Sequence, residues 1–179
     1  MSSAEIRKRL QQLQYATQQQ QAHHGNWNYR EVRPLPVVHV PSPNNETVDA
    51  DCSFGVKLLC YSAGAPDPTG FNYASYGNTV SIYQHLPHID LGQALPGDIV
   101  LYGPGGSDHA CMLYQWHDGR CWVWSHGHQG APEIVTLGAM SAYFGPECPV
   151  TWCQTLRPDP TPHAHGNPAR TGHPPKEKK

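Results

Sequence analysis

Residues 49–61 constrain the fold more than any other part of the chain. Apolar and cysteine side chains recur there at helical spacing on two faces, which leaves Ser53 and Lys57 as the residues that need water. A helix with apolar cover on two sides is a central helix of a core. Cys52 stands at its first turn, where unpaired backbone N–H groups favour a thiolate and lower the pKa of a thiol. The sequence therefore predicts a buried helix with a reactive cysteine at its N-terminus.

The composition of the chain limits the classes to which it can belong. With 179 residues, 38% hydrophobic and 15% charged, it can hold one core plus tails. Its 18 prolines and 17 glycines favour loops and short strands. A net charge of −2 and a pI near 6.6 give no electrostatic reason to expect nucleic acid or an anionic membrane as partner. We expect no membrane span and no signal peptide, because no apolar run approaches the roughly 18 residues that cross a bilayer.

The cysteines are too few for a disulfide scaffold of this length, and their spacing matches no standard zinc module. They are Cys52, Cys60, Cys111, Cys121, Cys148 and Cys153. Free thiols are expected. Cys148 and Cys153 are the one pair close enough in sequence to suspect of forming a bridge.

Residues 1–24 are predicted to form an N-terminal amphipathic helix or arm. Ser2 stands three positions before Glu5, which is the signature of a capping box. A thin apolar stripe follows, formed by Ile6, Leu10 and Leu13. The stripe is more suited to contact another surface than to build its own core, which indicates an attachment or self-association arm. A solvated helix without a partner is the alternative.

Three further segments follow from composition. Residues 25–47 combine Trp27 and Tyr29 with prolines and valines, and are expected to be an extended arm that lies along a domain. Residues 48–157 hold the predicted domain. Residues 158–179 contain Pro, His, Gly and Lys without an apolar anchor, so they are expected to be a disordered tail.

Short strands separated by turn signals dominate the second half of the domain. A short helix is expected at residues 79–86, and strands are expected at residues 99–102, 109–116, 121–125, 133–137 and 150–156. Asp118-Gly119 is a strong signal for a two-residue hairpin turn between the second and third of these strands.

The hairpin turn also predicts which side chains share a face of the sheet. Counting back along both strands from the turn puts Cys111 opposite His126. His109 then lies on the face of His126 and diagonal to it, and one further pair puts His128 opposite His109. The opposite face, with Ala110, Met112, Tyr114, Val123 and Ser125, is expected to be core or to pack against another layer. The register therefore predicts two or three clustered histidines.

Clustered histidines and a helix-terminal cysteine point to nucleophilic catalysis. A catalytic cysteine needs a histidine to move its proton and a third polar group to orient that histidine. Cys52, His109 and His126 supply this set, with His109 as base, His126 as orienting group and His128 as the alternative to His126. The rival chemistry is a zinc site formed by His109, Cys111, His126 and His128. We favour catalysis without metal or cofactor, because ligands on two strands usually need a knuckle or loop to complete a tetrahedron.

At these residues the chain resembles the NlpC-type family of papain-like cell-wall cysteine peptidases, over residues 48–140. The family's Asp-Cys-Ser motif stands as Asp51-Cys52-Ser53, and its Pro-Gly-Asp motif stands as Pro96-Gly97-Asp98. The family's base histidine corresponds to His109, and its third polar residue corresponds to His126. Phe54 replaces the glycine that usually follows the motif. The family's upstream Tyr and Gly-Gly are not found in the Pro-rich arm.

The resemblance implies an α+β, papain-like fold in which the nucleophile-bearing helix packs on a small antiparallel β-sheet. It implies cleavage of amide bonds in the peptide stems of bacterial peptidoglycan through a Cys-His-His triad. Asp51 and Ser53 would support the nucleophile or contribute to substrate and oxyanion binding, and the backbone N–H of Cys52 would be one oxyanion donor.

The place of action is an expectation by analogy. A separate N-terminal arm and the lack of a signal resemble phage-borne lysins or tail-associated hydrolases, which implies a phage virion or phage delivery to the bacterial cell wall. One alternative is a virion or tail structural component that retains the fold. Another is an amidase or acyltransferase with the same triad, because the thioester intermediate is common to all of these reactions.

Overall fold

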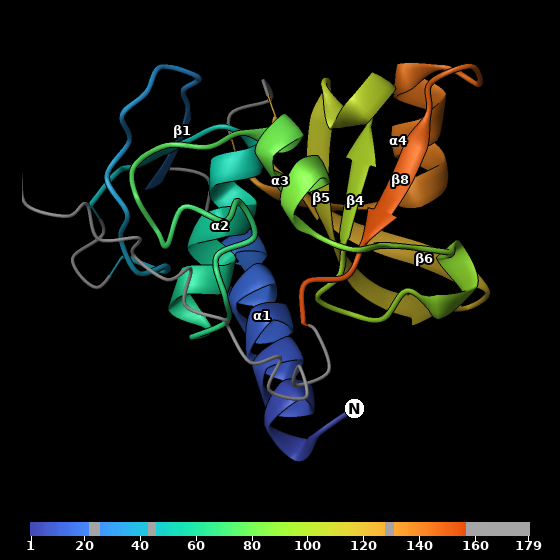
Figure 1. Ribbon diagram of the computed structural model, residues 1–179, viewed down its shortest axis with the longest axis horizontal. Coiled ribbons are helices and arrows are strands. Elements are labelled where there is room, and N and C mark those ends of the chain that lie inside the picture. The colour runs from blue at the N-terminus through green and yellow to red at the C-terminus, as the bar shows by residue number, and fades with distance from the viewer. Residues whose placement is uncertain (22–25, 43–45, 128–130, 157–179) are drawn as a thin grey trace, which may run out of the picture.

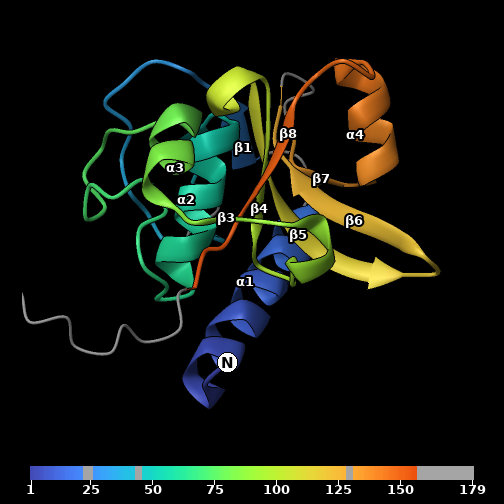
Figure 2. The same ribbon diagram turned by 45° about the vertical axis from the view of Figure 1, so that its right-hand side comes forward.

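The computed structural model describes residues 1–21, 26–42, 46–127 and 131–156. The predictions for His128 and for a tail at residues 158–179 lie outside these residues. A six-stranded antiparallel sheet forms the centre, with helices on both of its faces (Figures 1 and 2). The predicted α+β class is confirmed. Within the described ranges, no helix has the length and apolar character needed to cross a membrane.

The sheet has the strand order β3-β8-β4-β5-β6-β7, and every neighbouring pair is antiparallel. The strands are β3 (His88–Ile89), β4 (Ile99–Tyr102), β5 (His109–His117), β6 (Arg120–Ser125), β7 (Glu133–Thr136) and β8 (Val150–Cys153). The five strands predicted from the sequence are therefore confirmed to within a few residues. The short strand β3 was not predicted, because two residues carry no periodic signal.

Helix α2 (Cys52–Ser62) is the central helix, and its side chains from Cys52 to Cys60 are all buried. Asp51 caps it by accepting a hydrogen bond from the backbone N–H of Phe54 at 2.7 Å. The helix packs on β5, where Ala110 and Met112 belong to the same apolar cluster as the helix. The predicted nucleophile-bearing helix on an antiparallel sheet is confirmed.

Lys57 does not reach water, contrary to the prediction from helical spacing. Its side chain is fully buried, and its ammonium donates to the carbonyl oxygens of Ala74 at 2.5 Å and Tyr76 at 2.9 Å. The carboxylate of Asp67 lies 3.4 Å away. Burial lowers the pKa of Lys57, while Asp67 acts in the opposite direction. The lysine therefore fixes the loop that follows α2 to the helix.

Helix α1 (Ser3–Gln21) confirms the predicted N-terminal helix, but it packs through its polar side. Its buried residues lie about one turn apart: Glu5, Arg9, Gln12, Ala16 and Gln19. The amide of Gln12 contacts the sulfur of Cys60 on α2 at 3.3 Å. Ile6 and Leu10 of the predicted apolar stripe are 45% and 59% exposed. Ile6 and Leu10 are therefore directed away from the domain that the polar stripe contacts, whereas Leu13 is half-buried.

The Pro-rich arm runs along the domain and forms one short strand. Strand β1 (Trp27–Tyr29) pairs in parallel with β2 (Val48–Ala50), which ends two residues before Cys52. Trp27 packs edge-on against Trp124 of the sheet, with ring centroids 5.7 Å apart. The arm therefore covers the start of α2 and brings its aromatic side chains beside Cys52.

Two short helices complete the layers. The predicted helix at residues 79–86 is confirmed as α3 (Thr79–His85), and α4 (Leu137–Phe144) covers the sheet face opposite α2. Single 3-10 turns stand at Leu91–Gln93 and Pro104–Gly106. All six cysteines lie in the described part of the chain and are free thiols, so Cys148 and Cys153 form no bridge.

The β5–β6 hairpin follows the predicted register only near its turn. His117 pairs with Arg120 and Trp116 with Cys121, as predicted. A β-bulge at Tyr114 then shifts the pairing by one residue, so that Cys111 faces Ser125 instead of His126. A shift of one residue moves side chains to the other face of a sheet. The predicted register is therefore wrong beyond the bulge, and Ser125 takes the place predicted for His126.

Candidate active site

Cys52 is the first residue of α2 and lies against the beginning of β5. Its side chain is 5% exposed, and its sulfur faces the backbone N–H groups of Ala110, Ser53 and Cys52 itself. Ala110 directly follows His109. The structure thus brings the predicted nucleophile next to the strand end that carries the predicted base.

The surroundings of Cys52 oppose ionisation of its thiol. Burial and the nearby carboxylate of Asp51 raise its pKa to about 12, although the surrounding backbone N–H groups act in the opposite direction. The predicted lowering of this pKa by the helix terminus is therefore wrong. Desolvation outweighs the helix dipole here because the sulfur is buried under the arm and the sheet.

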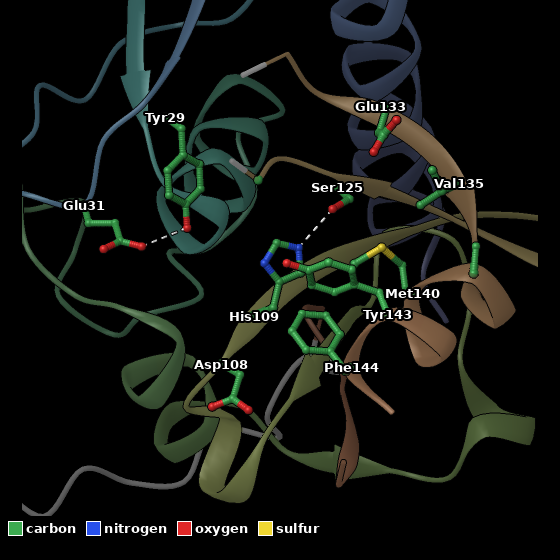
Figure 3. Close-up of a pocket in the computed structure, with 12 residues that line it drawn as sticks. Tyr29, Glu31, Asp108, His109, Ser125, Glu133, Val135, Met140, Tyr143 and Phe144 are labelled. Atoms are coloured by element: carbon green, nitrogen blue, oxygen red, sulfur yellow. Dashed lines mark hydrogen bonds between the residues drawn. The ribbon is translucent and has the colours of Figure 1, made fainter. Parts of the chain in front are cut away.

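His109 is buried at the start of β5, and its imidazole is held by a neighbour on β6. Its Nε2 lies 2.9 Å from the Oγ of Ser125, as Figure 3 shows. The ring also packs against Phe144 of α4, with centroids 5.5 Å apart. Ser125 of β6 and Phe144 of α4 therefore orient the imidazole on the sheet face that α4 covers.

His126 occupies a different environment from His109. Its Nε2 donates to the carbonyl oxygen of Ala50 at 3.0 Å, and its ring contacts Trp27 at 5.1 Å and Tyr29 at 5.5 Å. The side chain is fully buried, and burial lowers its pKa, so that the ring is neutral at pH 7. This hydrogen bond links the end of β6 to β2 at Ala50, which lies two residues before Cys52.

The two predicted supporting residues both contact the start of α2. One carboxylate oxygen of Asp51 accepts from the Oγ of Ser53 at 2.7 Å, in addition to the capping bond from Phe54. The other lies 2.6 Å from the guanidinium of Arg33, which belongs to the Pro-rich arm. A salt bridge therefore joins the Pro-rich arm to Asp51, the residue that precedes Cys52.

A cleft of about 550 Å³ opens beside His109 (Figure 3). Its lining includes three carboxylates and three aromatic rings, namely Glu31, Asp108, Glu133, Tyr29, Tyr143 and Phe144. None of the described residues that line it is a lysine or arginine. The cleft is therefore suited to a ligand with a positive charge and some apolar surface.

Tyr29 links the cleft to Cys52. Its hydroxyl donates to a carboxylate oxygen of Glu31 at 3.1 Å. Burial raises the pKa of Tyr29, and the nearby sulfur of Cys52 adds to this effect, so the phenol remains protonated. The sequence indicated only an aromatic residue in an extended arm, and nothing in its spacing marked Tyr29 as part of the site.

Other lining residues also escaped the sequence analysis. Ser125 was expected to lie in the core because the bulge at Tyr114 was not foreseen. Tyr143 and Phe144 belong to α4, for which no helix was predicted. Glu133 was seen only as the first residue of a strand. Each of these positions depends on contacts between distant segments.

The proposed zinc ligands do not form a cluster in the part of the chain that the structure describes. No group of three or more His, Cys, Asp or Glu side chains there is arranged to hold a metal ion. His109 and His126 are bonded to different partners, Ser125 and Ala50.

Comparison with known proteins identifies the fold. No model of a known family and no curated protein matches the chain. Among solved structures, the peptidoglycan hydrolase RipB from Mycobacterium tuberculosis matches with a TM-score of 0.52 at 17% identity, over 88% of this chain and 69% of that chain. RipD from the same organism, described as a non-catalytic NlpC/p60 domain protein adapted to peptidoglycan binding, matches with a TM-score of 0.50 at 14% identity, over 82% and 98%. The chain therefore has the fold of NlpC/P60 domains, with the Cys52 helix packed against an antiparallel sheet.

Proposed function

We propose that this chain is a thiol hydrolase that cleaves amide bonds in the peptide stems of bacterial peptidoglycan. Cys52 is the nucleophile and His109 is the base. The observation that carries the proposal is the contact between the sulfur of Cys52 and the backbone N–H of Ala110, directly beside His109. The fold shared with RipB, itself a peptidoglycan hydrolase, supports the substrate class.

The raised pKa of Cys52 requires general-base catalysis. His109 takes the thiol proton as the sulfur attacks the carbonyl carbon of the scissile amide, and the carbonyl electrons move to its oxygen. The backbone N–H of Cys52 stabilises this oxyanion. The C–N bond then breaks while His109 gives the proton to the leaving amine. Water, deprotonated by His109, hydrolyses the thioester to a carboxylic acid and restores the thiol.

The charges of the cleft restrict the substrate further. Glu31, Asp108 and Glu133 line it, and only His109 can bring a positive charge to the described lining. A stem peptide that presents an ammonium group near the scissile bond is therefore favoured over one that presents only carboxylates.

The proposal is tested by incubating the purified protein with peptidoglycan and identifying the released fragments by mass spectrometry. New amino ends within the stem would support the peptidase. Release of whole stems from the glycan would indicate an amidase, and transfer to an added amine would indicate an acyltransferase. Cys52→Ala serves as the control, and fragments released equally by this variant would contradict the proposal.

A second candidate is a domain that binds peptidoglycan without cleaving it. It is favoured by the burial of Cys52, which is 5% exposed and does not line the cleft. RipD is described as such a protein. A structural component of a virion or tail that retains this fold would also have a buried Cys52. Co-sedimentation with insoluble peptidoglycan, without release of soluble fragments, would support this candidate and contradict the hydrolase.

We further infer that α1 mediates self-association. The polar side of α1 packs against the domain, whereas Ile6 and Leu10 remain exposed. Light scattering of the purified protein and of an Ile6→Glu, Leu10→Glu variant tests this inference. The variant should have a lower mass than the parent, and equal masses would contradict self-association.

Delivery to the bacterial cell wall by a phage particle is also a proposal. The exposed Ile6 and Leu10 of α1 are compatible with attachment to such a particle. Mass spectrometry of particles purified from cells that carry the coding sequence tests it. Peptides of this chain in the particles would support the proposal, and their absence from particles while the protein is present in the cells would contradict it.

A further inference from the structure

We propose that Arg33 of the Pro-rich arm is a positioning residue for the nucleophile. Its guanidinium offsets the charge of the Asp51 carboxylate beside Cys52 and fixes the arm over the first turn of α2. The consequence for hydrolysis rests on the proposed function, whereas the charge pairing and its effect on the thiol do not.

All three nitrogens of the Arg33 guanidinium donate hydrogen bonds. Its Nη2 lies 2.6 Å from a carboxylate oxygen of Asp51 and 3.3 Å from the Oγ of Ser53. Its Nε donates to the carbonyl oxygen of Gly77 at 3.1 Å, and its Nη1 donates to that of Glu31 at 3.3 Å. The hydroxyl of Ser53 donates its own proton to the other carboxylate oxygen of Asp51 at 2.7 Å, which closes a ring of hydrogen bonds. This ring fixes the carboxylate that caps α2.

Phe54 supplies the surface on which the guanidinium lies. The Cζ of Arg33 is 5.0 Å from the centroid of this buried ring, within the range of a cation–π contact. The ammonium of Lys57 lies 5.7 Å from the same ring, but it donates to backbone carbonyl oxygens of the loop that follows α2. Phe54 and the arm are the two points at which the chain departs from the NlpC-type pattern, and Arg33 joins them.

The low exposure of the pair makes its charges effective. The side chains of Arg33 and Asp51 are 17% and 11% exposed, so little water screens them. Asp51 directly precedes Cys52, and a carboxylate in that place disfavours the thiolate. The guanidinium offsets part of this unfavourable charge. Arg33 therefore assists the transfer of the thiol proton to His109 without contacting either reacting group.

Other charged and titratable groups surround Cys52 and Asp51 on the arm, β2, α2, β5 and the end of β6. They are Tyr29, Glu31, Asp49, Lys57, His109, Cys111 and His126. All of them are kept in variants of Arg33 and Asp51. A difference between these variants therefore reports the charge pair itself.

The test is the rate at which iodoacetamide modifies Cys52 in the full chain, followed by mass spectrometry of the Cys52 peptide between pH 8 and pH 10. Arg33→Met should shift the pH profile upward by about one unit and slow the reaction roughly threefold to tenfold. Asp51→Asn, which keeps an oxygen for the helix cap, should react faster than the parent because the guanidinium is then unopposed. The variant with both changes should return to the parent rate, and Arg33→Lys should stay near it.

A clasp without an electrostatic role would give a different pattern. Loosening the arm would expose Cys52 and speed its reaction in Arg33→Met and in Asp51→Asn alike, so changes in the same direction would overturn the inference. Should Arg33→Met not fold, an Asp51→Asn variant that reacts no faster than the parent would overturn it as well. Arg30→Met is the matched control on the arm, because the side chain of Arg30 is 55% exposed and screened by water. An equal slowing in this control would also contradict the role of Arg33.

Hydrolysis of peptidoglycan is then measured on the same variants. Arg33→Met should lose roughly tenfold in kcat with little change in KM, and adding Asp51→Asn to this variant should recover most of the loss. A rise in KM with kcat unchanged would overturn the positioning role. A parent that shows the expected alkylation pattern but cleaves no peptidoglycan would instead overturn the proposed function.

Discussion

The guanidinium of Arg9 on α1 lies 2.6 Å from the carboxylate of Asp98 at the start of β4, and both side chains are buried. Asp98 also accepts from the backbone N–H groups of Leu95 at 2.8 Å and Thr155 at 3.2 Å. Burial raises the pKa of Asp98, while Arg9 and these N–H groups act against the shift. This pair ties the N-terminal helix to the start of β4 and, through Asp98, to the segment that follows β8.

Removing Asp98 should therefore destabilise the protein strongly. Asp98→Ala removes the nearer carboxylate from the buried guanidinium of Arg9 and leaves it Glu5 at 3.6 Å, so we expect a loss at the lower end of roughly 3–5 kcal/mol in the free energy of unfolding. Arg9→Met should cost less, because the remaining carboxylate keeps its backbone donors and can take up a proton. Urea denaturation measures both. Arg7→Met, an exposed position on the same helix, is the control, and equal losses in all three variants would contradict the pairing.

Replacement of Cys52 or His109 should abolish hydrolysis without unfolding the protein. Cys52→Ala removes the nucleophile, and His109→Ala removes the base, for which a loss of about 10² to 10⁴ in rate is usual. Both should keep the parent melting temperature within a few degrees. In the free protein, the partly buried Cys148 should react with iodoacetamide before Cys52, because the sulfur of Cys52 is buried and protonated. Preferential labelling of Cys52 would show that its thiol is more accessible than the structure indicates.

His126 should matter more for stability than for the chemical step. His126→Leu removes one of two donors to the carbonyl oxygen of Ala50, which keeps the backbone N–H of Arg30 at 3.0 Å, so we expect a loss of roughly 1 kcal/mol. His126→Gln, whose amide can still donate, should recover part of this loss. Chemical denaturation gives the stabilities, and initial rates on peptidoglycan give the activity. A His126→Gln variant that is fully stable but inactive would return His126 to the catalytic set predicted from the sequence.

Alkaline pH should unfold the protein through its buried thiols. Burial raises the pKa of Cys52, Cys60 and Cys153 to about 12 and that of Cys121 to about 11, from an ordinary value of 9.0. An unfolded thiol loses its proton first, so the stability present below pH 9.0 is lost as the pH rises towards 12, by up to about 1.4 kcal/mol per pH unit for each thiol. Burial also raises the pKa of Cys111, and the lowered pKa of Lys57 acts in the opposite sense, but it is one group against five thiols.

The alkaline effect is measured as the urea midpoint between pH 8 and pH 11 in the presence of a reductant. A Cys60→Ala, Cys153→Ala variant is the matched control, because it lacks two of the five thiols and should show a shallower decline. A midpoint that is constant over this range in the parent would contradict the buried-thiol account.

Neutralising the cleft should weaken the preference for cationic substrates. Glu133→Gln removes one of three lining carboxylates without changing the size of the side chain. We expect KM to rise for a stem peptide with a free ammonium group and to stay constant for the same peptide acetylated at that group. Added salt should reduce the difference, because exposed charges are screened. An equal change for both peptides would show that Glu133 contributes no charge recognition.

The sequence predicted what depends on local patterns. The two apolar faces of residues 52–61 predicted the central helix, and turn residues bounded five of the strands. The arm at residues 25–47 was also expected to lie along the domain. These features depend on neighbours within a few positions, where periodicity and turn chemistry act.

Features that depend on contacts between distant segments of the chain were not predicted. Lys57 was assigned to water because helical spacing does not show that a later loop supplies two carbonyl oxygens and Asp67. The pKa of Cys52 was assigned from its helix position, whereas the cover provided by the arm and sheet decides it. The third group at His109 was missed because a bulge leaves no reliable mark in a single sequence.

The bulge at Tyr114 has a consequence for how such a site can change over generations. Ser125 and His126 are adjacent in the sequence, and one unpaired residue on the neighbouring strand decides which of them faces Cys111. Pairing of Tyr114 with Val123 would restore the regular register and exchange a hydroxyl for an imidazole at that position, with both codons left untouched, whereas deletion of Tyr114 would remove the bulge and keep Ser125 opposite Cys111. A change of pairing in a neighbouring strand can therefore alter which side chains line a pocket as effectively as substitution within the pocket.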